Sequence, residues 1–456
     1  MRFSFNGAKR GVFSAVVAAA LFASGAAHAN PFDELERAQA AFDAKDYATA
    51  RQLLTPFAQK GFASAQVTLS LMNLNGLGSP VDYQAALRLM TAAANQDDAR
   101  AQYLLGTIYE LGQGVDPNPR QAMVWYQKAA KKMYLRATYQ IGTLYERGRG
   151  VPPNPTLAFS HYETAAKLGL PEAQEALGRA YMAGTLVKKD LVAAQVWLLA
   201  AAEQGEDRAQ FQLGLMYDLG EGVPEDNAKA LSYYRLAADQ GNEAAQFNLA
   251  LMLFNGEGTP QDQAGAVSWW EKAAEQGNAV AQLNLGYAYR DGTGVARDYS
   301  KAIVWMRKSA EQGTVSAQAM MGLMHRFGQG VPKDEKTAFD WFMKAAQKNH
   351  PGAQFNLGVM YREGAGVPKM ATQAVEWFTK SAEAGNLSAQ HNLALMLFRG
   401  DGVTKDYQKA YFWFLLASVE GDADSVRLRD QVERLLTPQQ ISAAQSQAST
   451  WRPKPR

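Results

Sequence analysis

The chain has 456 residues, of which 47% are hydrophobic and 20% are charged, and its formal net charge is +2. This balance is typical of a soluble protein and allows two or three compact domains or one long array of repeats. There is no cysteine, which excludes disulfide bonds and cysteine-linked lipid anchors, and the near-neutral charge gives no indication of nucleic-acid binding.

Residues 1–29 have the layout of a secretory signal peptide. Three basic residues precede the apolar run VFSAVVAAALFA, and the segment closes with Ala-His-Ala. We expect cleavage after Ala29 and a periplasmic or secreted protein. The alternative is a membrane anchor, but the run is shorter than the ~20 residues that a spanning helix needs, and no later stretch approaches that length. Without this segment Lys+Arg falls from 46 to 43 against 44 Asp+Glu, so the net charge becomes −1.

Residues 30–60 predict a short helical hairpin that caps the N-terminal end of the array. Its second helix already keeps the phase of the segment that follows, because Ala50 lies 36 residues before Ala86.

Residues 61–420 contain ten copies of one phrase on a 36-residue grid, as in AQLNLGYAYRDGTGV at residues 281–295. An Ala-Gln pair opens nine copies, and the remaining copy has Ala137 followed by Thr138. The Ala-Gln pairs start at positions 65, 101, 173, 209, 245, 281, 317, 353 and 389. A fixed period of this length is the signature of a solenoid whose units stack on one another.

Each unit predicts two helices, named here helix A and helix B. In helix A of the seventh copy, Ala281, Leu285 and Tyr289 fall on one face, and Gly286 beside them lets a partner helix approach closely. The Gly-x-Gly that follows predicts the end of helix A, because Gly accepts the left-handed conformation of a C-terminal cap. We expect Gln282 to be buried and bonded to the backbone of the neighbouring loop, with a ligand contact as the alternative.

Helix B begins near Asp298, a position that is Asp or Asn in nine copies and Met370 in one. Asp and Asn side chains cap the free N–H groups of a first helical turn. The Trp305 position is Trp in seven copies, and we expect it on the core face of helix B. Gly313 closes the helix; Met133 stands at the equivalent position, where we expect a local distortion or a helix that runs on.

The C-terminal end differs from the repeats. Residues 421–450 predict capping helices, of which the last starts at Thr437-Pro438 with Thr as the N-cap and Pro in the first turn. Residues 451–456 predict a disordered tail.

The consensus AQxxLGxxYxxGxGVxxDxxKAxxWxxKAAEQG resembles the Sel-one-like repeat (SLR) family, a branch of the tetratricopeptide-type α/α solenoids. The resemblance covers residues 61–420. It implies an all-α, right-handed superhelical solenoid of about ten helix pairs with helical end caps, in which helices A line the concave surface. It also implies a binding scaffold with no single chemistry. Cysteine-rich relatives carry disulfides between paired cysteines, but this chain has no cysteine, so the resemblance implies no disulfide here.

No motif of nucleophilic, metal-dependent or phosphate-binding catalysis occurs in the chain. Four histidines follow the signal segment, one each at scattered repeat positions, and we interpret them as packing variants rather than metal ligands or catalytic groups: His161, His325, His350 and His391. The sequence therefore predicts a protein without enzymatic activity, without a cofactor and without a metal site.

Asparagines recur on helix A, on the side opposite the core face. They are Asn248, Asn284, Asn356 and Asn392. They resemble the asparagines by which tetratricopeptide domains hold a bound peptide, since an amide can both donate to and accept from a peptide group. The alternative is a solvated consensus residue that bonds within the solenoid.

Arg290, Arg326 and Arg362 occupy one helix-A position in three successive copies. Forked guanidinium groups at this spacing favour a partner segment that carries carboxylates. The alternative is local pairing with Asp291 and Glu363. Aromatic residues also recur on this side and suit either peptide anchoring or packing between repeats.

These features favour an exported, non-enzymatic scaffold that binds a protein or an extended peptide in its concave groove, as an adaptor, assembly or regulatory factor of the bacterial envelope. The alternative from a different class is a binder of cell-wall or exopolysaccharide material, or a secreted factor that meets host proteins. A sugar binder would be expected to expose Trp, and the predicted core position of the repeated Trp favours the protein partner. A hydrolase lacks its nucleophile and base.

Overall fold

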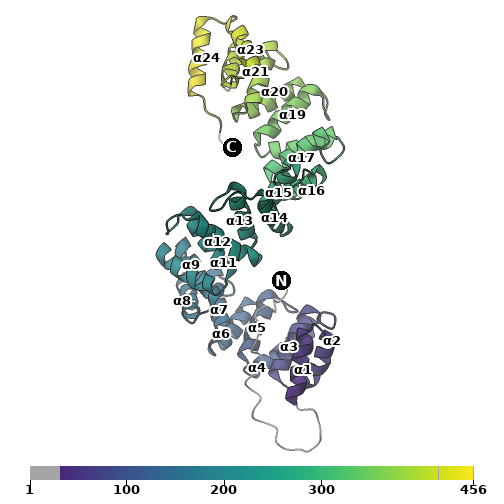
Figure 1. Cartoon of the computed structure of the whole chain (residues 1–456), viewed down its shortest axis with the longest axis vertical. Helices are drawn as coiled ribbons and strands as arrows, with labels where there is room; N and C mark the ends of the chain where they lie inside the picture. Colours follow the sequence, from purple (N-terminus) through teal and green to yellow (C-terminus); the bar gives the residue numbers. More distant parts are fainter. Residues whose placement is uncertain (1–30, 420, 455–456) are drawn as a thin grey trace, which may run out of the picture. The chain divides into compact units, whose positions relative to one another are not determined.

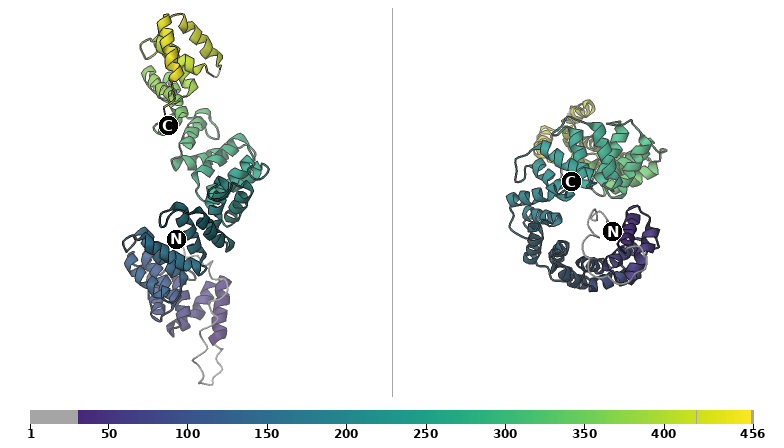
Figure 2. Two further views of the ribbon diagram at one scale, coloured as in Figure 1. Left: turned by 90° about the vertical axis from the view of Figure 1, so that its left-hand side faces the viewer. Right: turned by 60° about the horizontal axis from the view of Figure 1, so that its bottom comes forward.

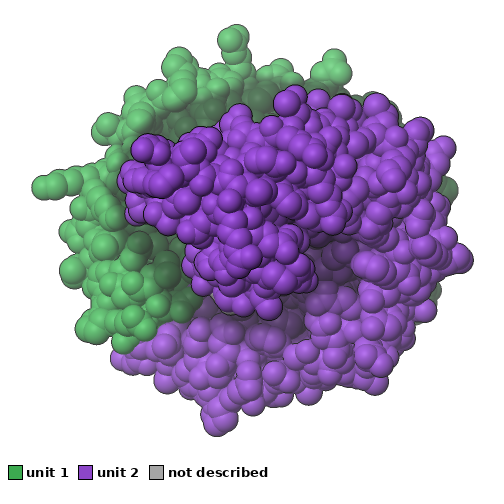
Figure 3. Space-filling model, turned by 90° about the horizontal axis from the view of Figure 1, so that it is seen from above, with its two compact units in different colours: residues 1–225 green, residues 226–456 purple. Residues whose placement is uncertain are grey.

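The structure of the protein, a computed structural model, describes residues 31–419 and 421–454 (Figure 1). The predicted signal segment lies outside these residues. The described residues form 24 helices and no strand, and none of those helices is both long and apolar enough to cross a membrane. The chain divides after Glu225 into two compact units, which Figure 3 colours separately.

The helices follow one another as antiparallel pairs within each unit (Figure 2). Unit 1 holds α1 (Pro31–Asp43), α2 (Tyr47–Gln59), α3 (Ala63–Asn75), α4 (Tyr83–Asn95), α5 (Ala99–Leu111), α6 (Pro119–Ala130), α7 (Leu135–Arg147), α8 (Pro155–Lys167), α9 (Pro171–Ala183), α10 (Leu191–Glu203) and α11 (Asp207–Leu219). Unit 2 holds α12 (Asn227–Asp239), α13 (Glu243–Asn255), α14 (Gln263–Glu275), α15 (Ala279–Asp291), α16 (Tyr299–Glu311), α17 (Val315–Phe327), α18 (Glu335–Ala346), α19 (Pro351–Glu363), α20 (Ala371–Glu383), α21 (Leu387–Arg399), α22 (Tyr407–Ala417), α23 (Ala423–Glu433) and α24 (Pro438–Thr450). The odd-numbered helices α3 to α21 are helices A, and the even-numbered helices α4 to α22 are helices B, which confirms an all-α solenoid of ten helix pairs.

Helices B start where the sequence predicts, and for the predicted reason. Asp298 accepts a hydrogen bond from the backbone N–H of Lys301 at 3.0 Å. The Asp or Asn at the eight other such positions caps its helix in the same way. Met370 has nearly the same backbone angles as Asp298 but offers no side-chain cap.

The two glycines of the Gly-x-Gly motif serve different purposes. Gly292 has φ 75° and ends α15, with its N–H bonded to the carbonyl of Ala288. Gly294 lies against the preceding helix B, because a Cβ on it would stand 2.3 Å from the carbonyl oxygen of Gln263. One glycine therefore ends helix A, and the other lets the loop touch the previous repeat.

The core position of helix B is one residue later than predicted. Met306 is fully buried and Trp305 is half-buried. At the other copies the position of Met306 holds Met90, Tyr126, Tyr162, Leu198, Tyr234, Trp270, Phe342, Phe378 and Phe414, all buried. A Cβ on Gly286 would come within 2.8 Å of Met306, which confirms that the two helices approach closely at Gly286. The side chain that Gly286 contacts is Met306, the residue after Trp305.

Most repeated Trp side chains lie at the edge of the core. A lysine one turn on places its ammonium 4.0 Å from the ring of Trp305, and 3.5, 4.1 and 4.3 Å from the rings of Trp269, Trp341 and Trp377. Trp125 and Trp413 are buried. The prediction that the Trp position forms the core is therefore wrong for the half-buried members.

A row of buried glutamines joins successive repeats. Gln282 donates from Nε2 to the carbonyl of Ala274 in the last turn of the preceding helix, at 3.0 Å, and accepts from Gln312 at 2.9 Å. The same donation recurs at Gln66, Gln102, Gln174, Gln210, Gln246, Gln318, Gln354 and Gln390. The predicted buried role is confirmed, although the partner is a helix terminus rather than a loop.

Met133 adopts a left-handed conformation with φ 59°. Asp97 and Asn349 do the same at the equivalent positions. Helix α6 ends at Ala130, so it does not run on. The left-handed conformation is present at these three positions although they lack Gly, because the chain must reverse direction there in every repeat.

The C-terminal end is more ordered than the sequence suggests. Thr437 and Gln440 form a reciprocal capping box at the start of α24, with Pro438 in the first turn, as predicted. Residues 451–454 have defined contacts, which corrects the expectation of a disordered tail for this stretch. Trp451 packs edge-on against Trp413, and Lys454 pairs with Glu383 at 2.6 Å.

Phe342→Ala should lower the free energy of unfolding by about 3–5 kcal/mol, because it empties a fully buried site. The neighbouring Trp341→Ala should cost clearly less, because Trp341 is only half-buried. Urea unfolding measures the difference, and amide hydrogen exchange should locate the Phe342 effect in α17 to α20. Equal costs for the two variants would contradict this assignment of the core position.

Met370→Asp should raise stability by about 1 kcal/mol, because it supplies the cap that the nine other helices B possess. Hydrogen exchange in the first turn of α20 should slow, and the melting temperature should rise. Met370→Ala serves as the control, since it removes the same exposed side chain without adding an acceptor. A gain shared by both variants would rule out capping as the cause.

Candidate functional site

The seven residues predicted to bind a ligand all lie on helices A of unit 2 and are all half-buried. We call this surface the helix-A face; it comprises Asn248 on α13, Asn284 and Arg290 on α15, Arg326 on α17, Asn356 and Arg362 on α19, and Asn392 on α21. None belongs to the buried core. This agrees with the prediction that they lie on the side of helix A opposite its core face, which Leu285 and Tyr289 mark in the seventh copy.

Arginine and asparagine of neighbouring repeats meet across this face. The NH1 group of Arg326 donates to Oδ1 of Asn356 at 3.0 Å, and Arg362 donates to Oδ1 of Asn392 in the same way. Arg290 directs NH1 to the sulfur of Met320 at 3.2 Å, because Met occupies the Asn position there. The structure thus brings together two Arg-Asn pairs that the sequence had placed only on a common face.

Two carboxylates neutralise most of the arginine charge. Arg290 makes a two-pronged contact with Asp291 at 2.7 and 2.6 Å, and this hydrogen-bonded carboxylate raises the pKa of Arg290. Glu363 accepts from Arg326 at 3.1 Å and from Arg362 at 3.3 Å. Three guanidinium groups therefore face two carboxylates. The local pairing with Asp291 and Glu363 that the sequence left open as an alternative is therefore present. Partly exposed ion pairs of this kind contribute at most ~1 kcal/mol each to stability.

The asparagines divide into two kinds. Asn356 and Asn392 accept from arginine and donate to carbonyls of their own helices at 2.8 and 2.7 Å, so both sides of their amides are engaged. Asn248 and Asn284 have no side-chain hydrogen bond to residues 31–419 or 421–454. Their helices also expose Leu251, one turn after Asn248, at 38% and Val280, one turn before Asn284, at 47%. Unpaired amides beside exposed apolar side chains suit contact with a peptide.

The aromatic residues predicted on this face mainly pack inward. Phe355 lies against the buried Phe378, and in unit 1 Tyr103 and Tyr139 lie against Tyr126 and Tyr162, with ring centroids 5.4–5.9 Å apart. Packing therefore accounts for these rings. Asn392 and Phe355 also line a pocket of about 530 Å³ near the N-terminus of α23.

Unit 1 contains a Tyr-Glu-Arg arrangement that sequence reasoning missed. Glu110 accepts from the hydroxyl of Tyr126 at 2.8 Å and from Arg149 at 3.1 Å. Glu146 accepts from Tyr162 at 2.6 Å and from Arg179 at 3.2 Å. Burial opposes ionisation of Glu146, but the hydrogen bonds from Arg179 and Tyr162 outweigh it and lower its pKa. The sequence did contain a pattern that could have revealed this arrangement, because a Tyr follows 16 residues after Glu110 and again after Glu146.

Four carboxyl groups gather at the N-terminal ends of α9 and α11. Glu172 pairs with Arg136 at 3.3 Å, and the buried Glu175 lies 3.8 Å from Arg179. Burial raises the pKa of Glu175. Burial and the nearby Asp207, Glu172 and Glu175 raise the pKa of Glu206 to about 7. In the described ranges 31–419 and 421–454, no group of three or more His, Asp or Glu side chains is placed to hold a metal.

The four histidines lie in different repeats and have separate surroundings. His161 stacks on Tyr145, with centroids 5.9 Å apart, and burial lowers its pKa. Burial also lowers the pKa of His325. His350 caps α19 by accepting from Ala353, and His391 lies 2.7 Å from the hydroxyl of Ser425.

The Sel1 repeat model matches ten consecutive segments of the chain, at residues 63–98, 99–132, 135–170, 171–206, 207–242, 243–278, 279–314, 315–350, 351–386 and 387–422. The chain belongs to the Sel1 repeat family. This agrees with the SLR resemblance of the consensus and with the paired helices of the structure.

Two solved Sel1 repeat structures are similar to this protein over most of its length. One is a protective antigen of uropathogenic Escherichia coli strains with an SLR fold, at 33% identity; the match covers 88% of this chain and 94% of that one, with a TM-score of 0.56. The other is a Sel1 repeat protein from Oxalobacter formigenes, at 32% identity over 69% of this chain and 93% of that one, with a TM-score of 0.51. No curated protein matches.

Glu206→Gln should stabilise unit 1 at pH 8 and have little effect at pH 4. The pKa of Glu206 is raised from 4.5 to about 7 in the folded protein. Its favourable contribution is therefore complete below about pH 4.5 and is lost as pH rises through about 7. Because the side chain is half-exposed, we expect a gain of about 1 kcal/mol at pH 8.

Thermal melting of the wild type and the variant across this pH range provides the measurement. Glu203→Gln is the matched control, because it makes the same substitution at an exposed glutamate of the preceding helix, outside the cluster of four carboxyl groups. A constant difference between Glu206→Gln and the wild type at all pH values would contradict the assignment.

Proposed function

We propose that this Sel1 repeat protein is a non-enzymatic scaffold that holds an extended segment of a protein partner on the helix-A face of unit 2. The observation that carries the proposal is the pair of half-buried amides at Asn248 and Asn284, which lack a partner in the described chain and stand beside exposed Leu251 and Val280. An extended segment has unpaired backbone N–H and C=O groups that such amides satisfy.

The arginines extend this surface towards a partner with acidic side chains. Helices A of successive repeats lie about 10 Å apart, and an extended peptide advances ~3.3 Å per residue. Each arginine would then meet roughly every third residue of the segment. A ligand carboxylate replaces Asp291 or Glu363 at small cost, because the existing pairs are partly exposed. The excess of one guanidinium over the two carboxylates favours such an exchange.

The location of the protein belongs to the same proposal. The signal-like residues 1–29 and the similarity to a protective antigen support a periplasmic or secreted protein with an adaptor, assembly or regulatory role in the bacterial envelope.

The polysaccharide alternative gains less from the structure. The sequence argued against a sugar ligand because it placed the repeated Trp in the core. Several Trp side chains on helices B of unit 2 are only half-buried, so that argument no longer holds. However, each carries a lysine ammonium within 4.3 Å of its centroid, so a sugar ring would first have to displace a lysine. The protein partner therefore remains the better reading.

Replacing Arg290, Arg326 and Arg362 together by Glu should weaken binding of the partner by about 100-fold. This corresponds to about 1 kcal/mol for each charge-assisted hydrogen bond lost. The partner is to be identified by co-purification from envelope extracts with mass identification, and its affinity measured by calorimetric titration. Circular dichroism should show an unchanged fold, because none of the three side chains is buried.

Arg307, Lys336 and Lys369 provide the matched control, since they are exposed cations of helices B and of a loop in the same repeats. Replacing these three by Glu produces the same change in net charge and should alter affinity by less than threefold. Equal losses for the two triple variants would mean that only net charge matters. Unchanged affinity in the first variant would remove the arginine row from the binding surface.

A further inference from the structure

The start of the array carries a charged residue at a position that is uncharged in the repeats. In α8 and α9, Phe159 packs edge-on against Tyr181 with centroids 5.6 Å apart, and Phe339 and Tyr361 repeat this contact at 5.5 Å in unit 2. The equivalent residues at the start of the array are Arg51 on α2 and Asn73 on α3. The position of Arg51 is otherwise occupied by Leu87, Met123, Phe159, Gln195, Leu231, Val267, Ile303, Phe339, Val375 and Tyr411. Arg51 is thus the single charged residue of this series.

Arg51 is incompletely satisfied by its surroundings. It donates from NH2 to Oδ1 of Asn73 at 2.7 Å and to the carbonyl of Leu77 at 3.4 Å. Its Nε is buried and has no acceptor. Within the described chain Arg51 has no ion pair with a carboxylate. A buried donor without an acceptor costs about 1–3 kcal/mol, so stability alone does not account for Arg51 at a position that is otherwise uncharged.

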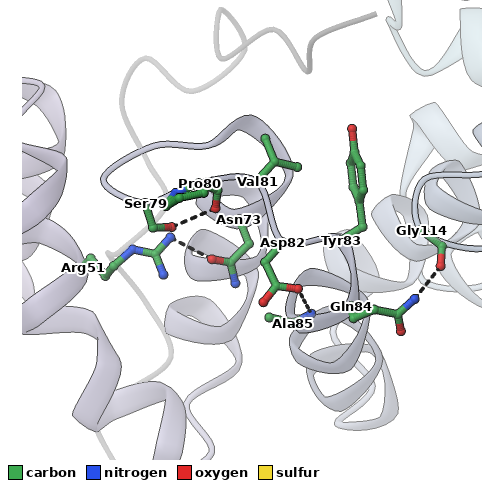
Figure 4. Close-up of a pocket in the computed structure, with 10 residues that line it drawn as sticks. All are labelled: Arg51, Asn73, Ser79, Pro80, Val81, Asp82, Tyr83, Gln84, Ala85 and Gly114. Atoms are coloured by element: carbon green, nitrogen blue, oxygen red, sulfur yellow. Dashed lines mark hydrogen bonds between the residues drawn. The ribbon is translucent and has the colours of Figure 1, made fainter.

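Arg51 and Asn73 line a pocket of about 660 Å³ (Figure 4). Arg51, Asn73 and Ser79 lie on one side of it in this view, and Tyr83 stands on the other. Val81 and Tyr83 are 48% and 45% exposed, which gives the rim two apolar surfaces.

The walls of this pocket are held in place before any ligand arrives. A Cβ on Gly78 would stand 2.6 Å from the carbonyl oxygen of Tyr47, so the loop lies directly on the start of α2. Oδ1 of Asp82 accepts from the N–H of Ala85 at 2.8 Å, and Gln84 donates to the carbonyl of Gly114 at 2.9 Å. A preformed site loses little freedom on binding.

We propose that this pocket binds a carboxylate that lies next to an apolar side chain, presented by a protein partner. Nη1 of Arg51 makes no hydrogen bond within the described chain, and the second N–H of Nη2 makes only the 3.4 Å contact with Leu77, so the two offer a fork that matches the two oxygens of a carboxylate. The apolar side chain rests against Val81 and Tyr83. This site lies in unit 1 and does not depend on the helix-A face of unit 2.

The test uses three small probes and the purified protein with ¹⁵N-labelled arginine. N-acetyl-leucine carries a main-chain carboxylate, N-acetyl-leucyl-aspartyl amide carries a side-chain carboxylate, and N-acetyl-leucinamide carries none. Titration with at least one carboxylate probe should give a saturable shift of the Arg51 guanidinium signals, because its Nη1 gains an acceptor. The amide should bind at least tenfold more weakly. Whichever carboxylate binds better identifies a chain terminus or an acidic side chain as the source.

Arg51→Gln is the decisive variant, because Gln195 occupies the equivalent position in an intact repeat. It should reduce the affinity for the carboxylate probes at least tenfold, leave the weak binding of N-acetyl-leucinamide unchanged, and keep the circular dichroism spectrum. Arg51→Lys should retain part of the preference for carboxylates, since it keeps the charge without the fork. The proposal is overturned if neither carboxylate probe gives a saturable shift, or if Arg51→Gln binds them as the wild type does.

Discussion

The contact on which this solenoid depends is the one between a small residue of helix A and the large side chain of helix B that covers it. A Cβ at Gly106, Gly142, Gly322 or Gly358 would come within 2.5–2.8 Å of a ring atom of Tyr126, Tyr162, Phe342 or Phe378. A larger residue would separate the two helices of a pair. The row of glutamines then joins one pair to the next, because each Gln amide satisfies a carbonyl at the end of the preceding helix. Packing defines the repeat, and hydrogen bonding joins the repeats.

The ten repeats of one array can be compared with one another position by position. Ten copies show which residue type each position needs for packing, so a departure that stability does not explain stands out. Arg51 is such a departure, since the equivalent position is uncharged in the ten repeats, and two of them place an aromatic pair there. Asn248 and Asn284 are another, because they leave amides unpaired where Asn356 and Asn392 bond to arginine. In a family whose fold implies no particular chemistry, these departures are the most specific guide to function.

Charge is arranged differently in the two units. Unit 1 brings Glu172, Glu175, Glu206 and Asp207 together, and burial, followed by the nearby negative charges, raises the pKa of Glu206 to about 7. Unit 2 presents arginines that are largely matched by Asp291 and Glu363. The ion pairs of unit 2 are partly exposed, so they contribute little to stability and are readily exchanged for those of a partner under the proposed function.

The sequence by itself determined the period, the two helices of each repeat, the caps at Asp298 and its equivalents, and the buried role of Gln282, because these depend on residues close together in the chain. It placed the core on Trp305 instead of Met306, because both fall within the same apolar stripe of helix B. Only Gly286, from the other helix, selects between them. The sequence likewise placed Arg326, Asn356 and Glu363 on one side of the solenoid. Their pairing was decided by the stacking of one repeat on the next, which brings residues 30 and 37 positions apart within hydrogen-bond distance. The pocket at Arg51 has the same origin, since its walls come from three helices and two loops that meet only in the folded chain.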